Sequence, residues 1–286
     1  NVDSSIKNII LNIRLPRILM AVLIGMLLAS SGTVVQTVFR NPLADPYIIG
    51  ISASATFGAV IAFMLELPDI MYGISGFITS VAVILLIFRL SSRKNGTDIT
   101  SLLIIGIAIS SFLGAFTSFS MYLIGQDSFK IVAWMMGYIG TSSWLRVGIL
   151  TIPLIISVAY FYLKRYDLDL LLSGDEEAHS LGLDVGKLKR NILIISSLIV
   201  GFSVAFTGMI GFVGLIAPHT IRLITKSSSN VKLIPLATLG GGLFLLICDT
   251  IGRTILSPVE IPIGIVTAFF GAPFFLYLAI KKGKGG

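Results

Sequence analysis

Long apolar stretches, separated by short polar or Gly/Pro breaks, make up most of the sequence. A helix that crosses a bilayer needs about 20 mostly apolar residues. Nine stretches of this kind follow one another, at about 16–38, 47–65, 71–90, 100–123, 146–163, 190–208, 212–226, 232–255 and 262–281. The pattern predicts an all-α, polytopic membrane protein with about nine transmembrane helices in this chain.

Some of the apolar stretches are shorter than the rest. The stretches 47–65 and 212–226 are marked by Gly and Pro, so we expect them to cross incompletely or to lie broken inside the bundle. The stretch 128–140 is too short to span the bilayer and is expected to form a helix along one membrane surface.

Composition supports the same class of protein. Apolar residues make up 55% of the 286 positions and charged residues 12%, with a mean hydropathy of +0.96. Soluble domains carry about a quarter charged residues. A secreted enzyme, a nucleic-acid-binding domain and a disordered chain are therefore excluded despite the net charge of +7. A single cysteine, Cys248, excludes a disulfide framework, and two histidines argue against a structural metal cluster.

The distribution of Lys and Arg gives the orientation, because cytoplasmic loops carry the excess of positive charge. The loops near 40, 89–94, 164–190, 222–232 and 281–284 together hold fifteen of the 21 basic residues, so we place them in the cytoplasm. Nine crossings with a cytoplasmic C-terminus put residue 1 outside. We therefore expect that a further helix precedes this sequence.

A weak internal repeat favours a transporter. A shift of 176 residues superimposes five residues of the first part on identical residues of the second: Arg14, Gly25, Ala29, Gly32 and Pro42 on Arg190, Gly201, Ala205, Gly208 and Pro218. Five crossings separate the two parts, so the repeat is inverted in the membrane, a common plan of transporters. Chance matching of Gly and Ala in apolar sequence is the alternative.

The cytoplasmic loop 164–190 is the most informative segment and holds six of the fourteen acidic residues. Ser173 and Glu176 have the spacing of a capping box, so a short helix is expected to start near Gly174. Gly182 is a natural helix stop, and Asp184 can cap a second helix that runs into the next span. The segment is predicted to be a docking element for a cytoplasmic partner or, alternatively, a solvated loop.

Three arginines lie on the predicted outer face. Arg14 and Arg17 flank Pro16 at the entry of the first span, and Arg253 follows Asp249 by one helical turn. Arginine matches carboxylates in a planar fork, so these residues could receive an acidic partner. Two alternatives are open: the arginines snorkel to lipid headgroups, or Asp249 and Arg253 satisfy each other as an i, i+4 pair.

The chain reverses on the cytoplasmic side at Asn41-Pro42-Leu43-Ala44-Asp45-Pro46. Two prolines together with Asn and Asp predict a rigid, helix-breaking turn. Its counterpart in the repeat is Gly214–His219, where small residues favour close helix contact. His219 is interpreted as a packed or interfacial side chain and not as a ligand.

Several motifs are absent. The sequence has no P-loop, so this chain does not hydrolyse nucleotide in that way. It also lacks the HExxH and GxSxG motifs of common hydrolases. Acidic residues within the apolar stretches are scarce, with Asp249 the main candidate, whereas ion-coupled carriers keep buried carboxylates. An energy source outside this chain is the simpler interpretation, and an ion-driven secondary transporter is the alternative.

Several motifs in order resemble one family over essentially the whole chain. They are RLPRILMAVLIGMLLASSGTVVQTVFRNPLADPYIIGIS, WMMGYIG, GDEEAHSLGL, GFVGLIAPHTIRLI and IPIGIVTAFFGAPFF. The sequence resembles the permease subunits of ABC importers for iron-siderophore complexes, haem and vitamin B12, the FecCD family. The resemblance implies ten transmembrane helices, of which the first is missing here, and a single transmembrane permease domain over 1–286.

The resemblance also implies partners and residue roles. Family permeases work as a homodimer in a bacterial or archaeal cytoplasmic membrane, with two ATPase subunits and an external substrate-binding protein. This chain would bind no cofactor or nucleic acid, while ATP and Mg would be used by the ATPase.

Matching positions carry the family roles. Arg14, Arg17 and Arg253 would dock the binding protein. Asn41 and Leu43, with Thr100 and Ser101, would form a cytoplasmic gate. The coupling helix would be Ser173 to Gly182, with Ser173, Gly174, Asp175, Glu176, Glu177, Ala178, His179, Leu181 and Gly182 as its site residues. The implied mechanism is alternating access, and the chelate is not identified by the sequence.

Overall fold

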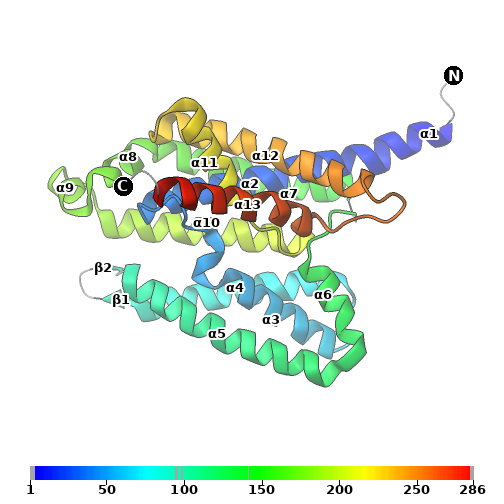
Figure 1. Cartoon of the computed structure of the whole chain (residues 1–286). Helices are drawn as coiled ribbons and strands as arrows, with labels where there is room; N and C mark the ends of the chain where they lie inside the picture. Colours follow the sequence, from blue (N-terminus) through cyan, green and yellow to red (C-terminus); the bar gives the residue numbers. More distant parts are fainter. Residues whose placement is uncertain (1–3, 94–95, 98, 141, 284–286) are drawn as a thin grey trace.

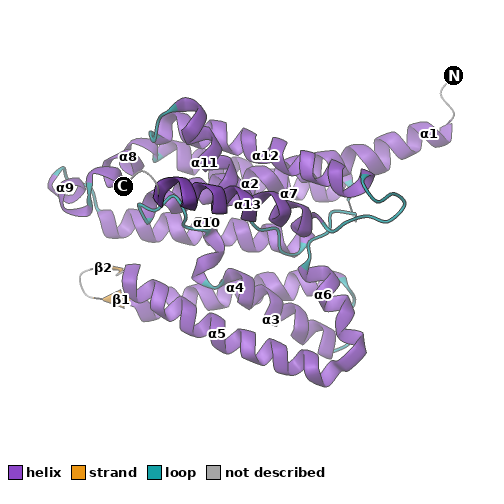
Figure 2. Ribbon diagram, in the orientation of Figure 1, coloured by secondary structure: helices purple, strands orange, loops and turns teal. Residues whose placement is uncertain are grey.

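The computed structural model describes residues 4–93, 96–97, 99–140 and 142–283. Within these residues nearly all of the chain is helical, as Figure 2 shows. The strands of the described part are β1 (Ser92–Arg93) and β2 (Gly96–Thr97), which form a two-residue antiparallel pair. The all-α prediction is therefore confirmed.

The helices follow the apolar stretches of the sequence. Their bounds are α1 (Ser4–Asn8), the π-helix η1 (Ile9–Arg14), α2 (Leu15–Val38), the 3₁₀-helix η2 (Pro46–Ile49), α3 (Ile51–Met64), α4 (Ile70–Ser91), α5 (Ile99–Ile124), η3 (Gly125–Ser128), α6 (Phe129–Met135), α7 (Trp144–Leu163), α8 (Arg165–Ser173), α9 (Asp175–Ser180), α10 (Val185–Thr207), α11 (Val213–Thr225), α12 (Asn230–Thr254) and α13 (Ile263–Gly283).

Six helical segments among the described residues are long and apolar enough to cross a membrane; they contain α2, α4, α5, α7, α10 and α12. Three shorter apolar helices, α3, α11 and the part of α13 up to Leu278, fall on the remaining predicted stretches. Shortness was expected for α3 and α11 but not for α13. The chain is thus a multi-pass membrane protein, and the number of nine crossings stays a prediction.

Two groups of helices lie side by side (Figure 1). Helices α3, α4, α5 and α6 form one group, and α2, α7, α8 and α10–α13 form the other. Helix α10 contacts both α2 and α4 and so joins the two groups. Helix α9 and the loop that follows α12 lie at opposite ends of the molecule (Figure 1).

Helix α2 is the central element of the larger group. Within the segment Ile6–Val38, 72% of an 18-residue apolar stretch is buried. The corresponding share for the segment that contains α5 is 22%. Glycines allow this burial, because an added Cβ at Gly25 would lie 2.3 Å from the Gly241 oxygen, and one at Gly32 would lie 1.9 Å from the Gly214 oxygen. Helices α11 and α12 therefore pack backbone against backbone on α2.

The two parts of the predicted repeat differ in local conformation at one pair of positions. Pro42 lies in the turn after α2, whereas Pro218 lies inside α11. Helix α11 continues through Pro218, so Gly214–His219 is helical and does not copy the turn at 41–46. The inverted repeat stays a prediction.

Candidate functional site

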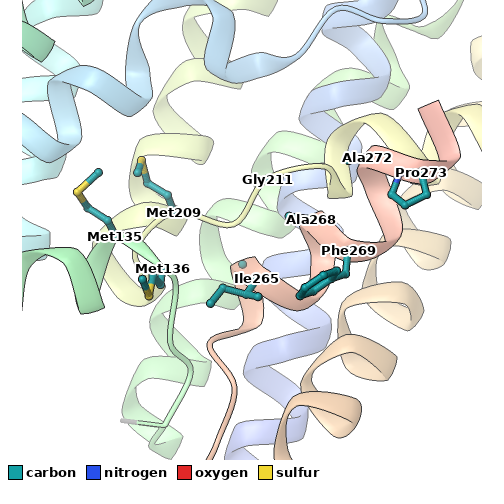
Figure 3. Close-up of a pocket in the computed structure, with 10 residues that line it drawn as sticks. Met135, Met136, Met209, Gly211, Ile265, Ala268, Phe269, Ala272 and Pro273 are labelled. Carbon is teal, nitrogen blue, oxygen red and sulfur yellow. The ribbon is translucent and has the colours of Figure 1, made fainter. Parts of the chain in front are cut away.

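A cavity lined by methionines opens between the two groups of helices. Its volume is about 560 Å³. Met135 and Met136 come from the end of α6 and the residue after it, Met209 from the connection after α10, and Ile265 and Phe269 from α13 (Figure 3). Thioether and hydrocarbon side chains adapt to irregular shapes and offer weak polar contact. The cavity therefore has an adaptable, weakly polar lining.

Three backbone segments meet beside this cavity. The Tyr138 amide donates to the Thr207 carbonyl at 2.7 Å, and the Gly264 amide donates to the Met136 carbonyl at 3.0 Å. Gly208 has φ +68°, and an added Cβ there would lie 2.0 Å from the Trp134 carbonyl oxygen. Only glycine fits this approach without strain, so Gly208 positions Met209 at the cavity wall.

Met209 also borders two further cavities, of about 300 and 510 Å³. The Ser52 hydroxyl donates to Met209 Sδ, and Thr56 lies 3.6 Å from the same sulfur. The larger cavity adds Ser110 and Thr117 of α5 to its lining. Met209 lines all three cavities. Their combined lining includes thioether and small hydroxyl groups and reaches Asp45 in the turn after α2.

The turn at 41–46 has the predicted form. Asn41 Oδ1 accepts a hydrogen bond from the Leu43 amide at 2.9 Å, and Asp45 Oδ1 accepts one from the Tyr47 amide at 2.8 Å and so caps η2. Leu43 is 56% exposed. Burial raises the pKa of the Asp45 carboxyl to about 6, and the Tyr47 amide opposes this shift. The turn therefore adds one titratable group to the cavity wall.

Thr100 and Ser101, the other predicted gate residues, lie in the first turn of α5. Helix α5 contacts η2, which directly follows the turn at 41–46. Gly106 and Ser110 of α5 lie beside Gly50, at the end of η2, and the assembly of Thr100 and Ser101 with Asn41 and Leu43 into one gate stays a prediction.

Arg17 lies at the centre of a charged cluster at the other end of the molecule. Its guanidinium donates to both oxygens of Glu260, at 2.9 and 3.0 Å, and to Asp249 Oδ1, at 3.0 and 3.1 Å. The Arg17 side chain is 13% exposed and that of Asp249 only 2%. Tyr138 lies beside the guanidinium, 5.9 Å from ring centroid to Arg17 Cζ. Arg17 is thus held within its own chain.

The other two predicted docking arginines have different surroundings. Arg253 Nε lies 3.0 Å from Asp249 Oδ2 as an i, i+4 ion pair without hydrogen-bond geometry. Arg14 is exposed at the end of η1, and within the described part of the chain it forms no ion pair. Arg14 is therefore the most accessible of the three, and Asp249 is shared by Arg17 and Arg253.

The predicted docking loop forms two short helices, α8 and α9, followed by α10. Helix α9 begins at Asp175, as expected, but the capping box at Ser173 is wrong. Ser173 is the last residue of α8, and Gly174, with φ 128°, occupies the N-cap of α9 without a side-chain cap. Buried Leu168 and Leu171 extend α8 through Ser173, so tertiary packing overrides the local signal.

The end of this loop follows the prediction. Gly182 has φ +90° and comes directly after Leu181, the C-cap of α9. The Asp184 carboxylate accepts a hydrogen bond from the Lys187 amide at 2.9 Å and caps α10. Two turns of the loop are thus fixed by local chemistry.

Helix α9 presents its acidic side chains outward. Glu176, Glu177, His179 and Leu181 are exposed, while Ala178 is buried against the protein. Asp175 is bound inward instead, to the buried Lys189 of α10 and, at 3.9 Å, to Arg40. The exposed residues form the outward face of α9, and Asp175 attaches the helix to α10.

The sequence did not predict the partners of three charged residues, Glu260, Asp169 and Lys189. Glu260 pairs with an arginine 243 positions away, and Asp169 binds Asn230 across 61 positions. No local spacing links such partners. Lys189 could have been noticed, because it is a charged residue among the buried positions of α10, and a buried charge needs a partner.

A multi-pass helical membrane protein with a weakly polar cavity between two helix groups, and with charged surfaces at its opposite ends, is a transport protein. The chain belongs to the FecCD transport family, whose model matches residues 1–281. It is 38% identical over 287 residues to the hemin transport system permease protein HmuU of Yersinia pestis, which covers 98% of this chain and 85% of that protein.

Two further similarities agree. The cobalamin import system permease protein BtuC of Halobacterium salinarum is 38% identical over 280 residues, 97% of this chain and 74% of that protein. A solved structure described as an inward-facing ABC transporter of the metal-chelate type superimposes with a TM-score of 0.89 at 33% identity, covering 98% of this chain and 90% of the other.

Proposed function

We propose that this chain is the permease subunit of an ATP-driven ABC importer and forms the translocation pathway for a metal chelate. The observation that carries the proposal is the family match over 1–281, together with relatives named for hemin, cobalamin and Fe(3+)-citrate import. A ferric siderophore, haem or cobalamin is the proposed class of cargo, and the weakly polar lining of the Met209 cavities is consistent with a pathway that does not hold such a chelate tightly.

The charged cluster near Arg17 is the proposed docking surface for an external substrate-binding protein. Arg14 and Arg253 supply the accessible positive charge, and Arg17 holds the cluster together through Asp249 and Glu260. Carboxylates on the partner would compete for Arg253 and pair with Arg14.

Helix α9 is the proposed coupling helix. Its exposed Glu176 and Glu177 suit a basic or dipolar cleft on a cytoplasmic ATPase, and its tie to α10 through Asp175 and Lys189 provides a rigid base. Two permease copies with two ATPase subunits would sit in a bacterial or archaeal cytoplasmic membrane. ATP and Mg belong to the ATPase, and this chain binds no cofactor.

Alternating access follows from this arrangement. ATP binding would bring the two ATPase subunits together, α9 would move with them, and the Met209 cavities would open to one side at a time. Asn41, Leu43, Thr100 and Ser101 are the proposed cytoplasmic gate.

A double charge reversal, Glu176→Lys with Glu177→Lys, tests the coupling assignment. Purification with the cognate ATPase subunit should then lose that subunit while the permease keeps its thermal midpoint. The matched control reverses two exposed acidic residues in the loop between α3 and α4, Glu66→Lys with Asp69→Lys, and should keep the ATPase bound. Equal ATPase binding by both double variants would contradict the assignment of α9.

A further inference from the structure

Asp169 of α8 connects the coupling region to the centre of the molecule. Its Oδ1 accepts hydrogen bonds from the Asn230 amide at 2.6 Å and from Asn230 Nδ2 at 2.8 Å, and its Oδ2 accepts one from the Ser229 hydroxyl at 2.6 Å. Ser229 is the N-cap of α12 and makes no side-chain cap of its own. The carboxylate therefore caps α12 from another helix, at the positive end of its dipole.

The connection continues from α12 to α2. Asn230 is fully buried, and its Oδ1 accepts a hydrogen bond from the Thr37 hydroxyl at 3.0 Å. Thr37 lies in the last turn of α2, four positions before Asn41 of the proposed gate, and its single hydroxyl proton is shared between Asn230 Oδ1 and the Thr33 carbonyl, 3.1 Å away. One carboxylate and one amide thus join α8, α12 and the end of α2 that leads into the turn at 41–46.

A second tie runs from α9 to the same place. Asp175 contacts Arg40, which lies just after α2, at 3.9 Å, and binds Lys189 of α10. The segment 165–180 is therefore attached at two points to the end of α2. The Asp169–Asn230–Thr37 connection resists separation, because a buried polar group left without its partner is costly. The Asp175–Arg40 ion pair is about half exposed, at 46% and 48%, and contributes less.

Resting on the proposed function, we infer that Asp169 is a positioning residue that carries movement of α8 and α9 to α12 and to the turn at 41–46. When α9 is displaced by the ATPase, the Asp169–Asn230–Thr37 connection makes α2 and α12 move with it. Without the connection, α8 and α9 shift alone, and ATP is hydrolysed without opening the pathway.

The test measures cargo taken up per ATP hydrolysed by the reconstituted importer. Asp169→Ala should lower this ratio about fivefold while the ATPase still copurifies. Asp169→Asn keeps one acceptor oxygen and should lie between this variant and wild type. Thr37→Val keeps the shape of the side chain, breaks the second link and should lower the ratio as well.

Asp167→Asn is the matched control. Asp167 lies on the same helix but pairs locally, at 2.8 Å, with Lys164, the residue before α8, so the ratio should stay at the wild-type value. A purely static cap would lower thermal stability and leave the ratio unchanged, and that result for Asp169→Ala and Thr37→Val would overturn the inference. If Asp169→Ala fails to fold, Thr37→Val and Asp169→Asn decide. A wild-type complex that does not couple hydrolysis to uptake would instead refute the proposed function.

Discussion

Arg17 and Glu260, 243 positions apart, form a two-point ion pair in which Nη1 of the arginine lies 2.9 and 3.0 Å from the two carboxylate oxygens. The pair fixes the loop after α12 against the beginning of α2. Asp249 binds the same guanidinium and also pairs with Arg253, so two arginines and two acids share the charge of this cluster. This relationship distinguishes Arg17, which is enclosed by its own chain, from Arg14, which is exposed and is proposed to bind a partner.

Arg17→Ala should destabilise the permease by about 3 kcal/mol, because it leaves the buried Asp249 carboxylate with Arg253 alone. The measurement is the thermal midpoint in detergent. The double variant Arg17→Leu with Asp249→Leu removes both charges and should recover most of the loss. A single variant as stable as wild type would show that the pair does not hold this end together.

Arg14→Glu should leave stability unchanged, since the exposed side chain makes no ion pair within the described part of the chain. Affinity for the substrate-binding protein should fall about tenfold, because a favourable charge becomes repulsive. Surface binding assays at two salt concentrations measure this, and the difference from wild type should shrink at high salt. Unchanged affinity would exclude Arg14 from the docking surface.

Asp45→Asn should flatten the pH dependence of stability. The pKa of Asp45 is raised to about 6, so the stability that this group contributes is fully present below pH 3.8 and is lost as the pH rises through about 6. The amide keeps an acceptor for the Tyr47 N–H. At pH 7 the variant should be more stable by about 1–2 kcal/mol. Thermal midpoints between pH 4 and 7 test this, and parallel profiles for variant and wild type would refute it.

Gly208→Ala should destabilise the protein by at least about 2 kcal/mol, because its φ is +68° and its Cβ would overlap the Trp134 carbonyl oxygen. Gly211→Ala, three positions away, is the control, since its Cβ would meet no atom of the described structure within 4 Å. Comparison of the two thermal midpoints is the measurement. Equal midpoints would mean that the backbone approach behind Met209 is unimportant.

Met209→Leu should preserve uptake and Met209→Lys should reduce it about tenfold, because a charge in an apolar wall is costly to dehydrate. Both variants should still copurify with the ATPase. Uptake at one cargo concentration, corrected for the amount of complex, is measured. A lysine variant with normal uptake would place the pathway elsewhere.

Local chemistry was predictable from the sequence, and long-range pairing was not. The apolar stretches marked helices such as α10 to within a few residues, and the Asp184 cap and Gly182 stop depend only on neighbours in the chain. Ser173 failed because buried Leu168 and Leu171 extend α8 past it. The i, i+4 pairing of Asp249 with Arg253 was open to prediction from sequence spacing, whereas only the fold shows that Arg17 is enclosed by Asp249 and Glu260.

Uptake of a ferric chelate into liposomes distinguishes an ATP-driven importer from an ion-driven secondary transporter. The permease is reconstituted with or without its ATPase, with the binding protein outside and Mg-ATP or an imposed proton or sodium gradient as the energy source. For an ATP-driven importer we expect uptake only with the ATPase and hydrolysable ATP, and this uptake should be unaffected when ion gradients are dissipated. Uptake that persists without the ATPase and follows an ion gradient would contradict this expectation and establish a secondary transporter.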